Sequence, residues 1–476
     1  MKKKLLAVGV AATLGALSGV SNAAITVAQN GVGHINILPY YSVQSGNTTL
    51  ISIANTDAVN GKAVKVRFRG AQFSDDVFDF QVFLSPADVW TAAVSLDGTV
   101  ARLATSDKSC TLPTSVNQQF VTARLLDANK AQGTREGYVE IINMGDIIDT
   151  AHGASTAQNA LFTATKHVNG VAPCTAATLI GTDAIPNDLT ASLSAPTSGL
   201  TSFATIINVA SSKAFTIPGT ALVQSTAVPV RYSRQANLTI GTASFGAAPA
   251  FGLLQTADSV FDTATGKVTM YEFDLPDLST PYGTASTTAQ LAELQGILQK
   301  ASVVTEYATA DSILAATDVV LSQPTRRYYY TWTDKPAIAD GDTQSSLATV
   351  SGASGPYASL VAAKNEISVG APSIYDREER TAGGSVVISP NPASGYTLIG
   401  EVSVVSINNG SGPTGALKAS LTAQDYAFAY DDGLARLSTT SANGPLPVIG
   451  FTAVNVFNAS VGASGTNYGQ VLPLKW

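Results

Sequence analysis

The sequence predicts a mainly β protein: an antiparallel, immunoglobulin-like β-sandwich with a loop-rich insertion and one short helix. Two observations support this fold class. Apolar residues alternate with polar ones at a period of two in several short segments. Turn residues separate these segments roughly every ten positions, which is typical of antiparallel sandwiches.

Residues 1–23 predict a secretory signal peptide. Lysines at 2–4 precede an apolar stretch at 5–17, and Ser21-Asn22-Ala23 carries small residues where signal peptidase cuts. We therefore expect an exported protein. Removal of the signal peptide takes away three of the 27 Lys and Arg residues and none of the 34 Asp and Glu residues, so the net charge falls from −7 to −10.

Residues 24–104 predict the N-terminal part of the sandwich. Val64, Val66 and Phe68 alternate with Lys65 and Arg67, which is the pattern of a half-buried strand. Asn60-Gly61, just before this strand, is a strong hairpin signal. The other expected strands are 34–43, 48–55, 78–84 and one that begins at Val89-Trp90.

Residues 105–200 predict a loop-rich insertion around one strand, Gly137–Asn143. Both cysteines, Cys110 and Cys174, lie in it. Two lone cysteines in an oxidising compartment most often pair, and neither has a Cys or His neighbour at zinc-site spacing. We therefore expect a Cys110–Cys174 disulfide, which would close a loop of about 64 residues and stabilise the fold by about 4 kcal/mol.

Residues 201–476 predict a β-rich region that either completes the sandwich or forms a second domain. The one good helix is expected at Ser286–Val303, where Leu291, Leu294 and Leu298 recur at helical spacing. The strands expected in this region are 201–208, 214–224, 319–321, 327–332, 384–389, 396–407 and 448–457.

The composition excludes several classes of protein. Only 13% of the residues are charged, against about a quarter in an average chain. The pI of about 5.0 gives no electrostatic footprint for nucleic acid, so no nucleic-acid partner is expected. No apolar run of about 18 or more residues follows the N-terminal segment, so no transmembrane helix is expected.

The lack of catalytic motifs in the sequence predicts a protein that is not an enzyme. The sequence contains no Gly-x-Ser-x-Gly elbow, no His-Glu-x-x-His pair and no Gly-rich phosphate loop. Its three histidines, His34, His152 and His167, offer few candidate bases. No catalytic residue is assigned.

Three acidic clusters are candidate Ca²⁺ sites, because Ca²⁺ takes about six to eight oxygen ligands and acidic loops between strands supply them. None matches an EF-hand loop, and Asp and Gly are also favoured in turns without a metal. Ca²⁺ is the only cofactor that the sequence suggests. The clusters are Asp75, Asp76 and Asp79; Asp340 and Asp342; and Asp431 and Asp432.

Two further features are candidate contacts with another molecule. The densest charge run contains Asp376, Arg377, Glu378 and Glu379, and it is either a solvated loop with local ion pairs or a specific polar contact. Trp90 and Trp332 are aromatic residues that a glycan-binding module would use, whereas core or rim packing is the commoner role of such residues.

The C-terminal residues leave an alternative open. Trp476, with Leu474, Leu472 and Tyr468 at alternate positions, partly resembles the closing strand of an outer-membrane barrel. Pro473 would interrupt the ladder of such a strand, and the chain lacks sustained ten-residue strands with aromatic girdles.

Six stretches spread over the mature sequence point to one family. They are LPYYSVQ at 38–44, KVRFR at 65–69, FQVFLSPADVW at 80–90, TEY at 305–307 with PTRRYY at 324–329, YDREE at 375–379 and LPVIGF at 446–451. Together they resemble exported cell-surface proteins of Gram-negative bacteria, some of them surface-layer-like. The resemblance implies export, a β-rich body and a structural role, and it supplies no catalytic residues. The ending LPLKW at 472–476 departs from the family pattern.

We therefore expect a structural protein on the outer face of the cell envelope, whose copies assemble as in a surface layer. A weakly charged body limits repulsion between copies, and exposed sheet edges offer backbone pairing. The expected partners are further copies of the chain and an outer-membrane component or lipopolysaccharide. The alternatives are a β-sandwich adhesin or glycan-binding module and, with less support, an outer-membrane β-barrel.

Overall fold

The computed structural model of the chain is mainly β, with 51% strand and 11% helix, which confirms the expected fold class. The predicted signal peptide lies outside the described residues. These are 25–122, 125, 130–150, 158–175, 178–179, 192–225, 228–233, 235, 239–243, 259–262, 267–271, 275–282, 286–329, 331–332, 350–351, 355–360, 365–381, 395–408, 415–428, 430–461 and 465–476.

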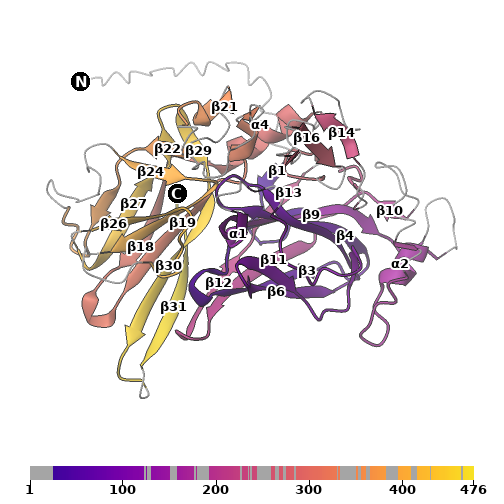
Figure 1. The fold of residues 1–476 in the computed structure, drawn as a ribbon, viewed down its shortest axis with the longest axis horizontal. Coiled ribbons are helices and arrows are strands. Elements are labelled where there is room, and N and C mark those ends of the chain that lie inside the picture. Colours follow the sequence, from indigo (N-terminus) through magenta and orange to yellow (C-terminus); the bar gives the residue numbers. More distant parts are fainter. Residues whose placement is uncertain are drawn as a thin grey trace, which may run out of the picture.

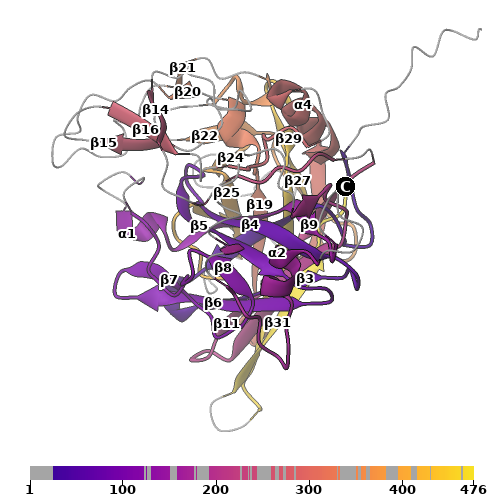
Figure 2. The ribbon, with the colours of Figure 1, turned by 90° about the vertical axis from the view of Figure 1, so that its right-hand side faces the viewer.

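Two sheets form a sandwich in the N-terminal half of the chain (Figures 1 and 2). Its strands are β1 (Ile25–Val27), β2 (Ile35–Ser42), β3 (Thr48–Asn55), β4 (Gly61–Gly70), β5 (Asp76–Leu84), β6 (Val89–Asp97), β7 (Val100–Ala104), β8 (Cys110–Leu112), β9 (Glu136–Ile147), β10 (Leu193–Ser194), β11 (Leu200–Asn208), β12 (Lys213–Pro218) and β13 (Thr220–Gln224). Sheet A has the order β1-β13-β2-β9-β4-β5-β8, with β10 paired to β9, and sheet B has the order β12-β11-β3-β6-β7.

The sandwich combines strands that the sequence places in different regions. β9 pairs with β2 and β4 in the middle of sheet A, although it comes from the expected insertion 105–200. β11 pairs with β3 in sheet B, although it follows residue 199. The expected boundaries at residues 104 and 200 therefore do not follow the sheets, because neighbouring strands here are far apart in sequence.

Further sheets are built from the C-terminal half (Figure 1). Sheet C has the order β26-β25-β19-β30-β31 and sheet D the order β18-β27-β23. Their strands are β18 (Ser302–Ala308), β19 (Ala316–Ser322), β23 (Ser373–Tyr375), β25 (Val402–Asn408), β26 (Ala423–Ala427), β27 (Asp432–Ser438), β30 (Ile449–Asn458) and β31 (Thr466–Pro473). The expected strand 384–389 lies outside the described residues.

Smaller elements complete the fold. The short pairings join β17 (Gln299–Lys300), β29 (Gly444–Pro447) and β28 (Thr440–Ser441); β22 (Glu366–Val369) and β24 (Tyr396–Ile399); β14 (Thr239–Ala243), β16 (Lys267–Tyr271) and β15 (Ser259–Asp262); and β20 (Thr331–Trp332) and β21 (Val350–Ser351). The α-helices in the described ranges are α1 (Lys130–Gly133), α2 (Ala160–Thr165) and α4 (Thr287–Leu298).

The expected helix forms as α4, but it ends earlier than the sequence suggests. The Ser286 side chain caps it by accepting a hydrogen bond from the Ala289 amide at 3.2 Å. Leu291, Leu294 and Leu298 are buried, as the spacing predicts. The residues after Leu298 belong to β17 and β18, because β-branched Val303 and Val304 favour a strand.

The sheets stack so that their apolar side chains form three successive cores. One core lies between sheets B and A, the next between sheets A and C together with α4 and with Ile206, Phe215 and Ile217 from one edge of sheet B, and the third between sheets C and D. On β19, Val320 enters the second core while Val319 and Leu321 enter the third. Sheets A and C are therefore covered on both faces, whereas sheets B and D each keep an outer face.

Candidate functional site

β4 carries the most unusual group of side chains in the described residues. Val64, Val66 and Phe68 pack in the core between sheets A and B, as expected. Lys65, Arg67 and Arg69 alternate with them on the opposite face, and all three are fully buried. The expectation of a half-buried strand is therefore wrong: β4 is covered on both faces.

The cover over these basic side chains comes from segments that are distant in sequence. Lys65 Nζ lies 2.8 Å from Gln235 Oε1, and an Arg67 Nη donates to the Pro276 carbonyl at 3.3 Å. Arg327 donates to the Ser74 carbonyl at 2.9 Å. These contacts bring residues 235, 276 and 327 onto the face that the alternation would leave to solvent.

Acidic side chains on β5 and β9, the strands that flank β4, neutralise its charges. Lys65 pairs with Asp79, and Arg67 Nη1 lies 2.5 Å from Asp76 Oδ2. Arg69 Nε lies 3.0 Å from Glu140 Oε1. Charged residues are rarely buried unless they are paired, so the acidic residues of the two flanking strands stabilise the buried basic residues of β4. We call Lys65, Arg67, Arg69, Asp76, Asp79 and Glu140 the ionic cluster.

Burial and pairing act in opposite directions on the titration of the ionic cluster. Desolvation lowers the pKa of Lys65, and the Asp79 carboxylate opposes that shift. Desolvation raises the pKa of Glu140, and the charges of Arg69 and Arg67 oppose it. The arrangement is suited to holding strands in one register, because displacing any member would leave its partner as a buried, unpaired charge.

The acidic residues expected to bind Ca²⁺ have other roles where the structure describes them. Asp76 and Asp79 are ion-pair partners of Arg67 and Lys65, and the Asp75 carbonyl accepts from the Gly70 amide at 2.9 Å. Within the described ranges, no group of three or more His, Cys, Asp or Glu side chains is placed to hold a metal ion. The expectation of a metal site at 75–79 is corrected to that of an ion-pair network.

The other two acidic clusters are not brought together. Asp340 and Asp342 lie outside the described residues. Asp431 is exposed, and its carbonyl accepts from the Thr309 amide at 2.6 Å. The Asp432 carboxylate lies 2.6 Å from Arg377 Nε, so it joins the charge run that the sequence singled out.

That charge run forms a turn with local ion pairs. The Asp376 carboxylate accepts from the amides of Glu378 and Arg380, at 3.0 and 2.7 Å, and pairs with the Arg380 side chain. Glu378 and Glu379 are exposed. The turn ties the end of β23 to β27 through the Arg377–Asp432 pair. This is the first of the two alternatives that the sequence left open, and a contact with another molecule stays a prediction.

Trp90 does not lie at a binding surface. Its side chain is fully buried in the core between sheets A and B, where its ring centroid is 5.3 Å from that of Phe80. The prediction that Trp90 contacts a partner is wrong, because the strand alternation turns it inward. Trp332 ends the two-residue strand β20, which pairs with β21.

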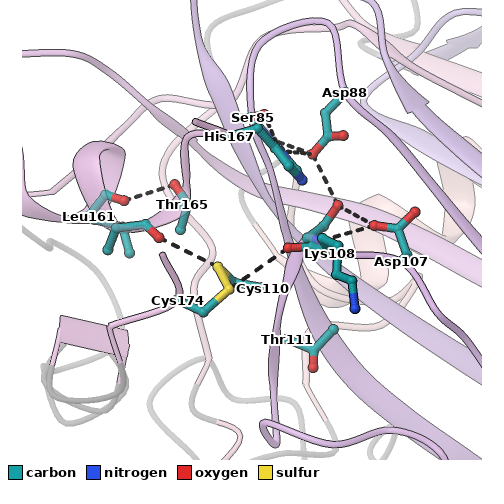
Figure 3. The surroundings of a disulfide bond; sticks show 12 residues. Ser85, Asp88, Asp107, Lys108, Cys110, Thr111, Leu161, Thr165, His167 and Cys174 are labelled. Carbon is teal, nitrogen blue, oxygen red and sulfur yellow. Dashed lines mark hydrogen bonds and ion pairs between the residues drawn. A yellow bond between two sulfur atoms is a disulfide. The ribbon is translucent and has the colours of Figure 1, made fainter. Parts of the chain in front are cut away.

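The expected disulfide is confirmed. Cys110 and Cys174 are bonded, with their Cα atoms 5.2 Å apart (Figure 3). The bond joins edge strand β8 of sheet A to the segment after α2, next to an apolar cluster that contains Phe83, Met144 and Phe162. It thus fastens the region 158–175 to the sandwich.

A serine, a histidine and an aspartate meet beside the disulfide, but not as a catalytic triad (Figure 3). His167 Nδ1 lies 2.9 Å from Ser85 Oγ and 3.4 Å from Asp88 Oδ2. A triad needs the two groups on different ring nitrogens. The Asp88 carboxylate also accepts from the Ser85 amide and from Ser109 Oγ, both at 3.1 Å, so the group fixes the turn before β6. Sequence spacing gave no sign of this group.

His34 is buried and hydrogen-bonded within the fold, which makes it a poor candidate base. Desolvation and the nearby Lys62 charge lower the pKa of His34 to about 4, so its ring is neutral. Its Nδ1 accepts from the Gln224 amide at 3.1 Å, and its ring contacts that of Tyr282 edge-on. His152 lies outside the described residues.

Comparison with known proteins adds no assignment: no family model, curated protein or solved structure matches the chain. None of the described helices is long and apolar enough to cross a membrane.

Proposed function

We propose that the chain is a non-enzymatic structural protein of the cell surface. In this proposal it is exported to the outer face of the envelope, and its copies assemble as surface-layer subunits. An outer-membrane component or lipopolysaccharide is the proposed attachment partner.

The observation that carries the proposal is the placement of the charges. Among the described residues, five basic and eight acidic side chains are buried. The basic ones are Lys62, Lys65, Arg67, Arg69 and Arg326. The chain has only 27 Lys and Arg and 34 Asp and Glu, so about a fifth of its charged side chains are buried in the fold and add no charge to the exterior.

A weakly charged exterior suits a subunit that must lie against many copies of itself. Net charge keeps proteins apart, and each charged group buried in a contact must lose its hydration. Internal ion pairs avoid both effects and also fix strand register. Lys62, which lies 2.9 Å from Asp146 and is fully buried, is a second example besides the ionic cluster.

The disulfide gives independent support for export. Bonded cysteines persist in oxidising compartments and are rare where thiols are kept reduced. Trp90, the first of the two tryptophans named for the adhesin alternative, is buried in the core, which weakens that alternative. No contact among the described residues favours a glycan site in its place.

The proposal is tested by sedimentation velocity of the purified, disulfide-bonded mature protein over a hundredfold concentration range, with and without a chelator. We expect species larger than the monomer that grow with concentration. A monomer at every concentration, in both conditions, would contradict the proposal.

A further inference from the structure

Sheet B ends the stack of sheets, and no residue in the described ranges packs over exposed Phe203, Leu50 and Val89 on its outer face. The strands of this sheet lie together in the lower half of Figures 1 and 2. Residues that pair directly across antiparallel strands point to the same side, so the register identifies this face. Phe203 pairs with Ser52 and Pro218, Leu50 with Thr205 and Ala93, and Val89 with Ala54.

The outer face carries few charges and presents large apolar side chains among Ser, Thr and Ala. Phe203 is 48% exposed, Leu50 40% and Val89 48%. The positions between them are Ser, Thr, Ala, Ile and Pro, and Thr205 Oγ1 lies 3.1 Å from Thr216 Oγ1. The two charged residues on the face, Asp97 and Arg102, pair with each other at 3.3 Å beside the β6–β7 turn.

We infer that this face is the contact surface for a second copy of the chain, which packs its own sheet B against it around a two-fold axis. The inference rests on the proposed function and names the interface that assembly would use. An isologous contact brings each patch against itself, so any net charge on the patch would repel its copy. On this face Asp97 and Arg102 neutralise each other, so contact between two copies brings no repulsion between net charges.

The size of the face also fits a stable contact. Five strands spaced about 4.8 Å apart are about 24 Å wide, and their mean length of about seven residues at about 3.4 Å per residue extends about 25 Å. Each copy would thus cover about 600 Å², and the two copies about 1,200 Å². A specific interface needs about 1,000 Å² in total. Two sheets packed face to face reproduce the packing that already joins sheets A and B within the chain.

The outer face of sheet D, at the other end of the stack, is a poor alternative. Exposed Glu306 and Arg436 lie on its neighbouring strands β18 and β27. The ion pair between Arg377 and Asp432 lies beside them. Burying this face against a copy would remove water from several charges. It does, however, carry Leu434, which is 37% exposed and provides a matched control position.

The test compares Phe203→Asp with Leu434→Asp in the mature, disulfide-bonded protein. Both substitutions place a carboxylate at an exposed apolar position in a strand. We expect Phe203→Asp to raise the dimer dissociation constant by at least about a hundredfold, because each copy would bury an unpaired carboxylate. Leu434→Asp should leave it unchanged. Circular dichroism identifies a variant that fails to fold, and Phe203→Ser, which loses only apolar area, should then weaken the dimer more mildly.

The outcomes separate this inference from the proposed function. If the wild type assembles and both Asp variants assemble equally well, another surface makes the contact, and the inference fails while the proposed function stands. If the wild type is a monomer throughout, the proposed function fails as well. If the monomer binds envelope polysaccharide and Phe203→Asp abolishes that binding, the face belongs to a glycan and the inference is overturned.

Discussion

Asp318 lies at the centre of sheet C and provides a quantitative test of how the interior treats charge. Its carboxyl group is fully buried on β19, where one oxygen accepts from the Leu417 amide at 2.7 Å. Desolvation raises its pKa from 3.8 to about 6, and hydrogen bonds from Ser406 and Leu417 oppose the shift only in part. Within the described ranges, no ion pair joins Asp318 to a basic side chain, in contrast to the carboxylates of the ionic cluster.

The sign of the effect follows from proton binding. Between about pH 4 and pH 6 the folded state holds a proton on Asp318 that the unfolded state has released, so stability falls as pH rises through this range. With pKa values of 3.8 and about 6, the loss approaches about 3 kcal/mol above pH 7. Between pH 4.5 and 7.5 it amounts to about 2 kcal/mol.

The substitution Asp318→Asn isolates this contribution, since the amide keeps an oxygen for Leu417 and does not titrate. We would measure the free energy of unfolding by denaturant titration at pH 4.5 and 7.5 for both proteins. From pH 4.5 to 7.5, the free energy of unfolding of the wild type should fall by about 2 kcal/mol relative to that of the variant. Val320→Ala on the same strand is the control and should lower stability equally at both. Identical pH dependence in wild type and Asp318→Asn would refute the reasoning.

Two further predictions concern stability. Arg67→Met should destabilise the protein by about 3–5 kcal/mol, because it leaves Asp76 buried without its 2.5 Å partner. Arg377→Met, which breaks a pair whose arginine is largely exposed, should cost less than about 1 kcal/mol, and equal costs in denaturant titrations would contradict the account. Replacing both Cys110 and Cys174 by Ser should cost about 2–5 kcal/mol. Thermal unfolding should give the double variant a lower Tm than the oxidised wild type, and adding reductant should not change the Tm of the variant. Equal Tm values for the variant and the oxidised wild type would exclude a stabilising role for the bond.

Local sequence patterns predicted the positions of individual strands and of the helix well. The segment 48–55 became β3 with the expected ends, and the alternation at 78–84 became most of β5. Ser286 and the leucines after it placed the start of α4. In each case turn residues, caps and side-chain period act over a few positions, so a single sequence contains the whole signal.

The ionic cluster could not be predicted, since it depends on what covers β4. Lys65, Arg67 and Arg69 give the same alternation whether they face water or the carboxylates of Asp79, Asp76 and Glu140. The segments that bury them lie about 170 or more residues away, at Gln235, Pro276 and Arg327. The same limit explains why acidic residues near position 75 suggested a metal site, because their basic partners lie on a different strand.

The central claim is that this protein assembles with copies of itself on the cell surface. Electron microscopy of negatively stained cell envelopes carrying the full chain tests it most directly, with envelopes carrying Phe203→Asp prepared in parallel. We predict a periodic surface array that is lost or disordered in the variant. Envelopes that carry the wild-type protein on their surface in equal amount and show no periodic order would contradict the claim.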